Sequence, residues 1–494
     1  MARPAQLLVG LDVGSGSSKA SVFTLSGELV RTSSRGYSPT TPRPGVAEYD
    51  PREVQDCAVS ALADAVAGLP VGAVAAIAVS AMMSGAVAID KHGSPVGPYT
   101  TTLDTRFSSD LDWVLSVGGD AIRLANGSGQ PTLAPKILWM DRDPDIGPHA
   151  AKYVLAGSLV ASHLAGLDAD HHFVDETYLW TTGLADVARR EWSPELCALL
   201  GIDRERLPRI VRSAEVIGGL SESVAQRTAL QSGIPIVAGC GDQPAGFVGS
   251  GAAIAGVGAD CAGTYSVVAG VTSHFAVRSE SDAPDVVPVA SGSGFNLQSM
   301  VNGGGLTRQW AERLFGIGDV EDELMRAAPG ARGVRFSPHL GGQAYPARPE
   351  SRGGWTGLNW AHTPLDLYQA VLEGISLDNA RAFVRMKGLY PDVELNTVSV
   401  FGGGAKSAAW NQMKANVAGL VYESLGDFPV ASLGVAMIAG QGVNLINDAT
   451  ARCDEIRRVE AVFRPDDEMH ERYLALADDY EVMVSGLASL DARR

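Results

Sequence analysis

The stretch Gly239-Cys240-Gly241-Asp242-Gln243-Pro244-Ala245-Gly246 follows an apolar run at 234–238 that is typical of a short buried strand. A carboxylate therefore lies among glycines at the point where a strand ends. Asp is rarely buried without a partner, so Asp242 is a candidate for proton chemistry. The glycines would let a substrate approach the backbone closely. The alternative is an ordinary turn residue, because Asp is frequent in turns.

A second glycine-rich turn lies near the N-terminus. Residues 6–13 and 20–23 are apolar and rich in β-formers, and they enclose Asp12-Val13-Gly14-Ser15-Gly16-Ser17-Ser18-Lys19, which predicts a hairpin. Backbone N–H groups at such glycines and serine hydroxyls can bind phosphate, and Lys19 could add a positive charge. The spacing of a Walker A loop is missing. A plain hairpin turn is the alternative.

The second half of the chain repeats this pattern. The segment Ala262-Gly263-Thr264-Tyr265-Ser266 lies between two apolar runs, at 255–261 and 267–268. A helix predicted at 365–387 precedes a strand at 397–401, and Gly402-Gly403-Gly404 then opens a helix over 407–420. Three glycines before a helix exceed what a simple connection needs, which favours nucleotide binding over a plain turn.

The order of elements predicts an α/β fold with two related domains. Two hairpin strands, a third strand, an amphipathic helix at 51–68 and a buried strand at 74–80 open the chain. With 494 residues the chain is too long for one core. We therefore expect domains at 1–249 and 250–494. A charged tail from Asp454, with a helix over 469–487, should pack on the second domain.

Bulk composition excludes several classes of function. A net charge of −17 argues against nucleic acid as a partner, because phosphate backbones need basic surfaces. Five scattered cysteines without CxxC spacing and the lack of a signal-peptide pattern favour a cytoplasmic protein without disulfides or zinc. No apolar run reaches about 18 residues, so no membrane span is expected. We interpret His171-His172 as structural, because neighbours in a strand face opposite sides and no third ligand has a suitable spacing.

Taken together, the motifs resemble the FGGY carbohydrate kinases. The resemblance depends on an ordered set of segments that runs from about Leu8 to Ala439: GLDVGSGSSK, TTLDTR, TLAPKILW, GCGDQPAG, GTYS, FGGGAKSAAWNQ and SLGVAMIA. It implies two actin/hexokinase-type (ribonuclease H-like) domains with an active-site cleft between them. The N-terminal domain would bind the sugar and the C-terminal domain the nucleotide, and a homodimer would be an alternative to the monomer.

The resemblance also implies roles for individual residues, with ATP and Mg²⁺ as cofactors. Asp242 would be the catalytic base, and Asp12 would lie near the metal and the phosphates, through water. The residues expected on the sugar side are Met83, Ser84, Asp104, Arg106 and Gln243. The residues expected to bind ATP are Gly14, Ser15, Ser17, Lys19, Gly263, Thr264, Gly305, Gln309, Gly404 and Ala405. From the residues alone, Asp104 and Arg106 could equally form a surface ion pair.

The motifs define the substrate that would accept the phosphoryl group less well than they define the kinase reaction. Ser84 replaces a His of the xylulokinase-like pattern, and Gln343-Ala344 replaces a Glu-Arg pair, so that both charges are lost. Gln243 is glycerol-kinase-like, where xylulokinases have Asn. The resemblance implies a primary hydroxyl of a small sugar or polyol, with a ketopentose such as xylulose first. Glycerol, erythritol, ribulose or gluconate are alternatives, as is a non-catalytic sensor of the same fold.

Overall fold

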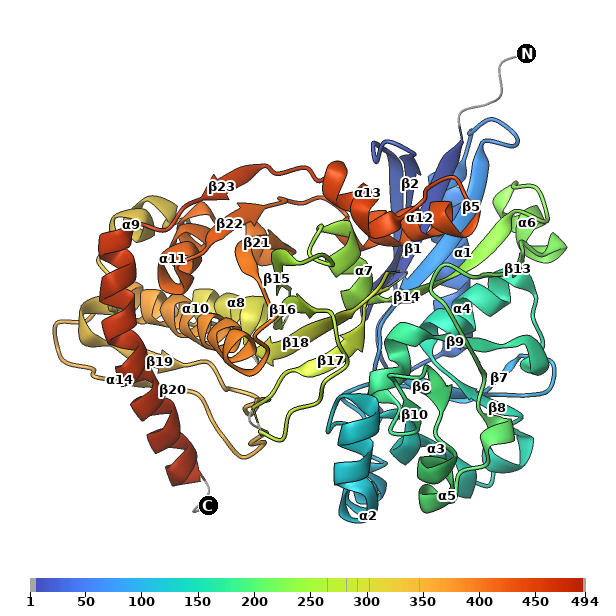
Figure 1. Cartoon of the computed structure of the whole chain (residues 1–494), viewed down its shortest axis with the longest axis horizontal. Coiled ribbons are helices and arrows are strands. Elements are labelled where there is room, and N and C mark those ends of the chain that lie inside the picture. The colour runs from blue at the N-terminus through green and yellow to red at the C-terminus, as the bar shows by residue number, and fades with distance from the viewer. Residues whose placement is uncertain are drawn as a thin grey trace.

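The computed structural model describes residues 6–263, 265–280, 282–290, 292–301, 303–345 and 347–491. Two lobes, each built around its own sheet, lie side by side (Figure 1). The N-terminal lobe has a six-stranded sheet in the order β13-β14-β5-β1-β2-β3. Its strands are β1 (Leu7–Val13), β2 (Ser17–Thr24), β3 (Leu29–Gly36), β5 (Val74–Ala81), β13 (Val216–Gly219) and β14 (Pro235–Gly241).

The predicted N-terminal hairpin is confirmed. β1 pairs antiparallel with β2, and this register places Asp12 opposite Lys19. β5 lies parallel to both β1 and β14, so the carboxyl ends of these three strands meet at one edge of the sheet. Helix α1 (Pro51–Val66) packs on this sheet, with Asp50 as its N-cap and Pro51 in its first turn. The edge at which β1, β5 and β14 end is where Asp12 and Asp242 are found.

The C-terminal lobe repeats the same unit in a seven-stranded sheet. Its order is β17-β18-β16-β15-β21-β22-β23. The hairpin β15–β16 and the parallel pair β15–β21 reproduce the arrangement of β1–β2 and β1–β5. The strands are β15 (Gly256–Ala262), β16 (Ser266–Thr272), β17 (Asp285–Pro288), β18 (Phe295–Val301), β21 (Leu395–Phe401), β22 (Val421–Ser424) and β23 (Ala461–Phe463). The prediction of two related α/β halves is therefore confirmed.

Two helices connect the lobes. α7 (Asp242–Gly249) follows β14, whereas α12 (Val430–Gly442) comes from the C-terminal part of the chain and packs on both α7 and β1. A Cβ at Gly434 would overlap the carbonyl oxygen of Ala245 in α7, and one at Gly10 in β1 would overlap that of Ser432. Because glycine lets these backbones touch, one apolar core extends across both sheets. A domain boundary at 249–250 stays a prediction.

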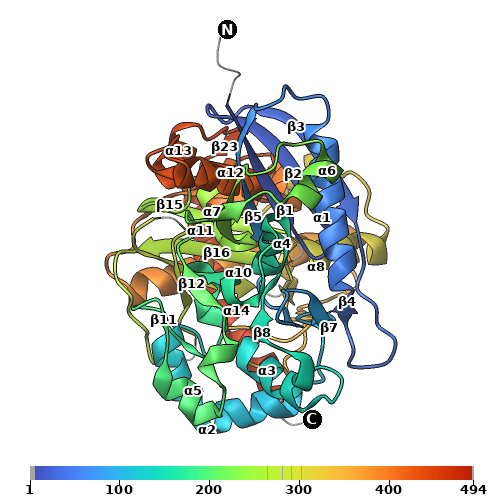
Figure 2. The same ribbon diagram turned by 90° about the vertical axis from the view of Figure 1, so that its right-hand side faces the viewer.

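The remaining elements surround the two sheets, with α2, α3 and α5 at the end of the N-terminal lobe away from α12 (Figures 1 and 2). A four-stranded sheet contains β4 (Glu48–Tyr49), β6 (Ala86–Ile89), β7 (Pro95–Thr100) and β8 (Lys152–Val154). Three two-stranded pairs are β9 (Phe173–Asp175) with β12 (Arg209–Val211), β10 (Ala185–Asp186) with β11 (Glu191–Trp192), and β19 (Arg335–Ser337) with β20 (Gly354–Thr356). The other helices are α2 (Ser108–Asn126), α3 (Leu133–Arg142), α4 (Ala156–Ala165), α5 (Pro194–Leu200), α6 (Glu222–Thr228), α8 (Gly304–Phe315), α9 (Glu321–Arg326), α10 (Pro364–Leu389), α11 (Ala408–Ala418), α13 (Ala449–Glu455) and α14 (Asp467–Asp491).

Two local predictions differ from the structure. His171 and His172 lie at the end of a 3₁₀ turn (Ala169–His171), not within a strand, because Asp168 caps this turn. His172 is buried beside Ser158, and His171 pairs with Asp168, which agrees with a structural role. The tail contains β23 before its helix, and α14 packs against α10 and α11 of the second lobe. Within the described ranges, no helix is both long and apolar enough to cross a membrane.

The contact between α7 and α12 can be tested with a matched pair of glycine substitutions. Gly434→Ala should lower the thermal midpoint, because the new methyl group forces the helices apart at a cost of about 1–3 kcal/mol. Gly119 in α2 faces open space, so Gly119→Ala should stabilise the fold by about 0.5–1 kcal/mol through helix propensity. Its thermal midpoint should therefore rise slightly. Calorimetry measures both. Equal shifts in the two variants would contradict the close contact.

Candidate active site

Asp242 lies where β14 gives way to α7. It is the first residue of the helix, with Gly241 as the N-cap, and its Oδ1 accepts the Gln243 N–H at 2.8 Å. Its side chain is half-buried. Burial, with the charge of Asp12 as a second cause, raises the pKa of Asp242 from 3.8 to about 7. A carboxyl group with such a pKa is a stronger base than an ordinary Asp, and it is accessible from solvent.

Asp12 lies beside Asp242 at the end of β1. Its register partner on β5 is Ser80, whose Oγ donates to Asp12 Oδ1 at 2.8 Å. Burial raises the pKa of Asp12, while the Ser80 hydrogen bond and the charge of Lys19 oppose this shift. The structure thus brings Asp242 beside Asp12, which is far from it in sequence, and Asp12 lies opposite Lys19 in the hairpin. The two carboxylates repel each other, and this favours a cation between them.

A buried hydrogen-bond chain holds the backbone just before Asp242. The Gly241 N–H donates to Thr177 Oγ1 at 2.9 Å, and Thr177 Oγ1 donates to Asp175 Oδ1 at 2.6 Å. All three residues are buried. Because the last peptide of β14 is fixed in this way, the first turn of α7 has a defined direction. The sequence analysis missed Thr177 and Asp175.

The first phosphate-loop candidate is supported by two tyrosines. Tyr37 donates its hydroxyl to the Gly14 carbonyl, and Tyr49 donates to the Ser15 carbonyl. The two rings pack edge to face at 5.5 Å between centroids. Across a planar trans peptide the C=O and the following N–H point in opposite directions, so the N–H groups of Ser15 and Gly16 point away from the tyrosines. Ser17 and Lys19 follow within β2.

The nucleotide-side residues of the second lobe meet at the end of β15. The Gly305 N–H donates to the Gly263 carbonyl at 2.7 Å. A Cβ at Gly404 would contact Ala262 closely, and the Ala405 carbonyl accepts from Asn411 Nδ2 at 2.8 Å. Gln309 is exposed on α8, and Thr264 lies outside the described residues. Of the glycines predicted for nucleotide binding, Gly263, Gly305 and Gly404 therefore form one cluster in the second lobe.

The predicted acceptor side lies against the same strand ends. Met83 packs so closely on Gly241 that a Cβ there would overlap its thioether. Asp104 is buried, and Arg106 donates through Nε to Asp104 Oδ1 at 3.0 Å and also pairs with Glu48. The ion pair between Asp104 and Arg106 therefore forms with its carboxylate buried, and a role of these two residues in sugar binding stays a prediction. Ser84 and Gln243 are half-buried.

Lys136 is a further cation on this side, which the sequence analysis missed. Its ammonium group donates to the carbonyls of Ser84 and, at 3.1 Å, of Thr101, and its side chain is 1% exposed. Burial lowers the pKa of Lys136 to about 7, and the charge of Asp104 opposes this shift. Its position among the apolar residues of 133–140 was the available indication, because Lys is rarely buried without a partner.

Comparison with known proteins gives the family. The model of the FGGY family of carbohydrate kinases, N-terminal domain, matches residues 7–249, and the C-terminal domain model matches residues 290–442. Xylulose kinase of Escherichia coli is 28% identical over 452 residues, covering 89% of this chain and 90% of that protein. Gluconokinase of Bacillus subtilis is 25% identical, covering 83% and 82%. The ligand-bound xylulose kinase structure from Lactobacillus acidophilus has a TM-score of 0.90 at 23% identity, covering 99% of each chain. The predicted actin/hexokinase-type fold is confirmed.

The raised pKa of Asp242 has a consequence for stability. A carboxyl group whose folded pKa exceeds its unfolded value of 3.8 stabilises the fold when protonated, and this contribution is lost as the pH rises through 7. Asp242→Asn should therefore raise the thermal midpoint. The expected gain in the free energy of unfolding is on the order of 1–2 kcal/mol at pH 8 and less at pH 5. Asp170→Asn, at an exposed position, is the control. A gain that is equal at the two pH values would contradict the assignment.

Proposed function

Because this chain belongs to the FGGY family of carbohydrate kinases, we propose that it transfers a phosphoryl group from ATP to a primary hydroxyl of a ketopentose such as xylulose, with Asp242 as the base. Kinases of this family are phosphotransferases that use ATP as the phosphate donor. The observation that supports Asp242 most is its raised pKa at the point where β1, β5 and β14 end. The glycine cluster at β15 supports a nucleotide on the other side.

The proposed chemistry is mainly one of positioning. The acceptor hydroxyl would donate its proton to Asp242 as its oxygen attacks the terminal phosphorus of ATP, and ADP would leave. The N–H groups of Ser15 and Gly16, held by the two tyrosines, would bind phosphate oxygens, with Ser17 and Lys19 beside them. The backbone around Gly263, Gly305, Gly404 and Ala405, together with Thr264 and Gln309, would bind the remainder of the nucleotide.

Mg²⁺ fits the residues at this site. Asp12 has one oxygen bonded to Ser80 and a like charge beside it, so its carboxylate would be stabilised by a cation. Magnesium is commonly bound by one or two carboxylates, waters and substrate phosphates. Asp12 would hold it through water, and Mg²⁺ when bound would neutralise negative charge on the phosphates.

The acceptor side favours a neutral sugar. Both of its cationic side chains already have partners, because Arg106 pairs with Asp104 and Glu48 and Lys136 donates to two carbonyls. A sugar acid such as gluconate would have to compete for them, whereas hydroxyl groups can bind to Ser84 and Gln243 without doing so. This observation ranks a ketopentose or a neutral polyol above gluconate.

The proposal also includes the division of labour between the lobes. Sugar binding by residues 1–249 and nucleotide binding by residues 250–494 agree with a first sheet that ends at Gly241 and a second that begins at Gly256. A cytoplasmic location belongs to the same proposal.

An ADP-release assay with xylulose, ribulose, glycerol, erythritol and gluconate tests the function. Asp242→Asn should lower sugar-dependent kcat by about 10²–10⁴, because the base is lost, and should keep ATP binding. Gln243→Asn serves as the neighbouring control and should keep kcat within about tenfold. If Asp242→Asn retains full sugar-dependent turnover, Asp242 is not the base. Preference for gluconate over every neutral acceptor would refute the ranking of substrates.

Lys136→Met should raise the KM for the sugar about tenfold while the KM for ATP stays the same. The physical reason is that the carbonyls of Ser84 and Thr101 lose a shared donor, which costs about 1–3 kcal/mol and loosens the acceptor side. Lys152→Met is a matched control, because Lys152 also donates to two backbone carbonyls, those of Glu205 and Leu207. A rise of both KM values in Lys136→Met would contradict a role specific to the sugar.

A further inference from the structure

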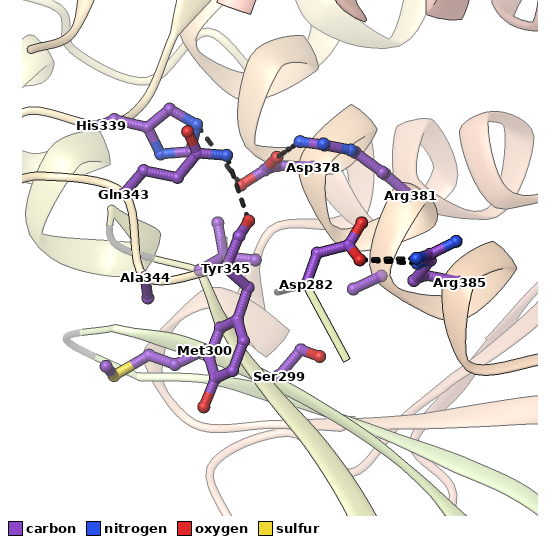
Figure 3. Close-up of a pocket in the computed structure, with 12 residues that line it drawn as sticks. Asp282, Ser299, Met300, His339, Gln343, Ala344, Tyr345, Asp378, Arg381 and Arg385 are labelled. Atoms are coloured by element: carbon purple, nitrogen blue, oxygen red, sulfur yellow. Dashed lines mark hydrogen bonds and ion pairs between the residues drawn. The ribbon is translucent and has the colours of Figure 1, made fainter. Parts of the chain in front are cut away.

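The pocket that Figure 3 shows in the C-terminal lobe, between α10, β18 and the segment 339–345, is too small for a sugar. Its cavity of about 30 Å³ has room for a few water molecules at most. Arg385 and Asp282 in its wall already pair with each other. The buried polar groups that bear on the proposed reaction lie instead in the N-terminal lobe, next to the strand end that precedes Asp242.

Thr177 takes the place of a neighbouring strand at the end of β14. The pairing of β13 with β14 covers Pro235–Val237 and ends well before Gly241. At Gly241 the backbone N–H donates instead to Thr177 Oγ1, at 2.9 Å. A buried backbone N–H needs a partner, so the hydroxyl of Thr177 completes the bonding of the last residue of the strand.

Tyr178 holds the end of the adjacent strand in a similar way. Its hydroxyl donates to the Ala81 carbonyl at 2.8 Å, and Ala81 is both the last residue of β5 and the register partner of Gly241. Thr177 and Tyr178 are consecutive in one 3₁₀ turn (Glu176–Thr181). One short segment therefore bonds to both strand ends beside the start of α7.

The bonds of Thr177 have a defined direction. Its hydroxyl donates to Asp175 Oδ1 at 2.6 Å, and its backbone N–H donates to the same oxygen at 2.9 Å. A hydroxyl group has a single proton, so the oxygen of Thr177 accepts from Gly241. Thr177 and Asp175 are 0% and 3% exposed, and water therefore does not compete for these bonds. The chain runs from Asp175 through Thr177 to the backbone just before Asp242.

The position of Gly241 sets the direction of the Asp242 side chain. Gly241 is the N-cap of α7, and Asp242 is the first residue of that helix. A shift of the N-cap would turn the carboxylate away from the acceptor hydroxyl, and a misplacement of about 1 Å can cost about 10²-fold in rate. We propose that Thr177 and Asp175 are positioning residues, which orient Asp242 for proton transfer. This inference rests on the proposed function, in which Asp242 is the base.

Four substitutions separate positioning from a general effect on stability. Thr177→Val keeps the shape of the side chain and removes the hydroxyl, whereas Thr177→Ser keeps the hydroxyl. Thr181→Val is the matched control, because Thr181 is buried in the same 3₁₀ turn and its hydroxyl donates within that turn, to the Tyr178 carbonyl at 3.0 Å. Asp175→Asn tests the other end of the chain, because an amide oxygen is a weaker acceptor than a carboxylate.

Steady-state ADP release with ATP and the preferred acceptor of the wild type gives kcat and both KM values for the full-length proteins. We expect Thr177→Val to lower kcat about 10–100-fold while both KM values stay within about threefold. Thr177→Ser and Thr181→Val should keep kcat within about threefold of the wild type, with Asp175→Asn between these and Thr177→Val. Amide hydrogen exchange in the segment 239–246 should be faster in Thr177→Val than in Thr181→Val.

Equal kcat values for Thr177→Val and Thr181→Val overturn the proposal. If Thr177→Val does not fold, Asp175→Asn decides in the same assay, and a kcat equal to that of the wild type overturns it. Failure of the proposed function has a different result, because the wild type itself would then show no sugar-dependent ADP release and both ideas would be refuted. Turnover that is lost in Asp242→Asn but kept in Thr177→Val overturns the positioning role alone.

Discussion

The arrangement of the site depends on one close contact between backbones. Gly434 of α12 touches the Ala245 carbonyl of α7, and α7 begins at Asp242. Since α12 also lies on β1, whose last residue but one is Asp12, the same helix sets the positions of both carboxylates. The chain segment that does this is 430–442, which is almost two hundred residues from Asp242 in sequence. The packing of the shared core and the placement of Asp12 and Asp242 therefore depend on the same helix, α12.

The two repeated units each have an aspartate near the end of their first strand. Asp12 lies on β1 two residues before Gly14, and Asp260 lies on β15 three residues before Gly263. Asp260, however, is fully buried and pairs with Lys414 at 2.7 Å, with Ser266 and Asn379 around it. Its charge is therefore neutralised inside the second lobe, whereas Asp12 faces another carboxylate. The repeat supplies one scaffold twice, with a buried structural acid in the second lobe and an acid at the proposed site in the first.

Local sequence was enough to predict the repeated strand–glycine–strand units and the position of Asp242, because apolar runs and glycines act over short distances. Lys136 and Thr177 could not be found in that way, since their partners, Ser84 and Gly241, lie 52 and 64 residues away. For Asp104 and Arg106 the sequence left two alternatives, and only the fold shows that the carboxylate of their ion pair is buried.

The proximity of Asp12 to Asp242 also couples the binding of a cation at the site to the uptake and release of protons. At neutral pH part of the Asp242 population holds a proton, because its pKa is about 7. Any positive charge that enters beside these carboxylates favours their ionised forms and expels that proton. The heat of such a binding event then contains the ionisation enthalpy of whichever buffer takes up the proton. Binding of a cation at this site is therefore expected to release a proton from Asp242 into the solution.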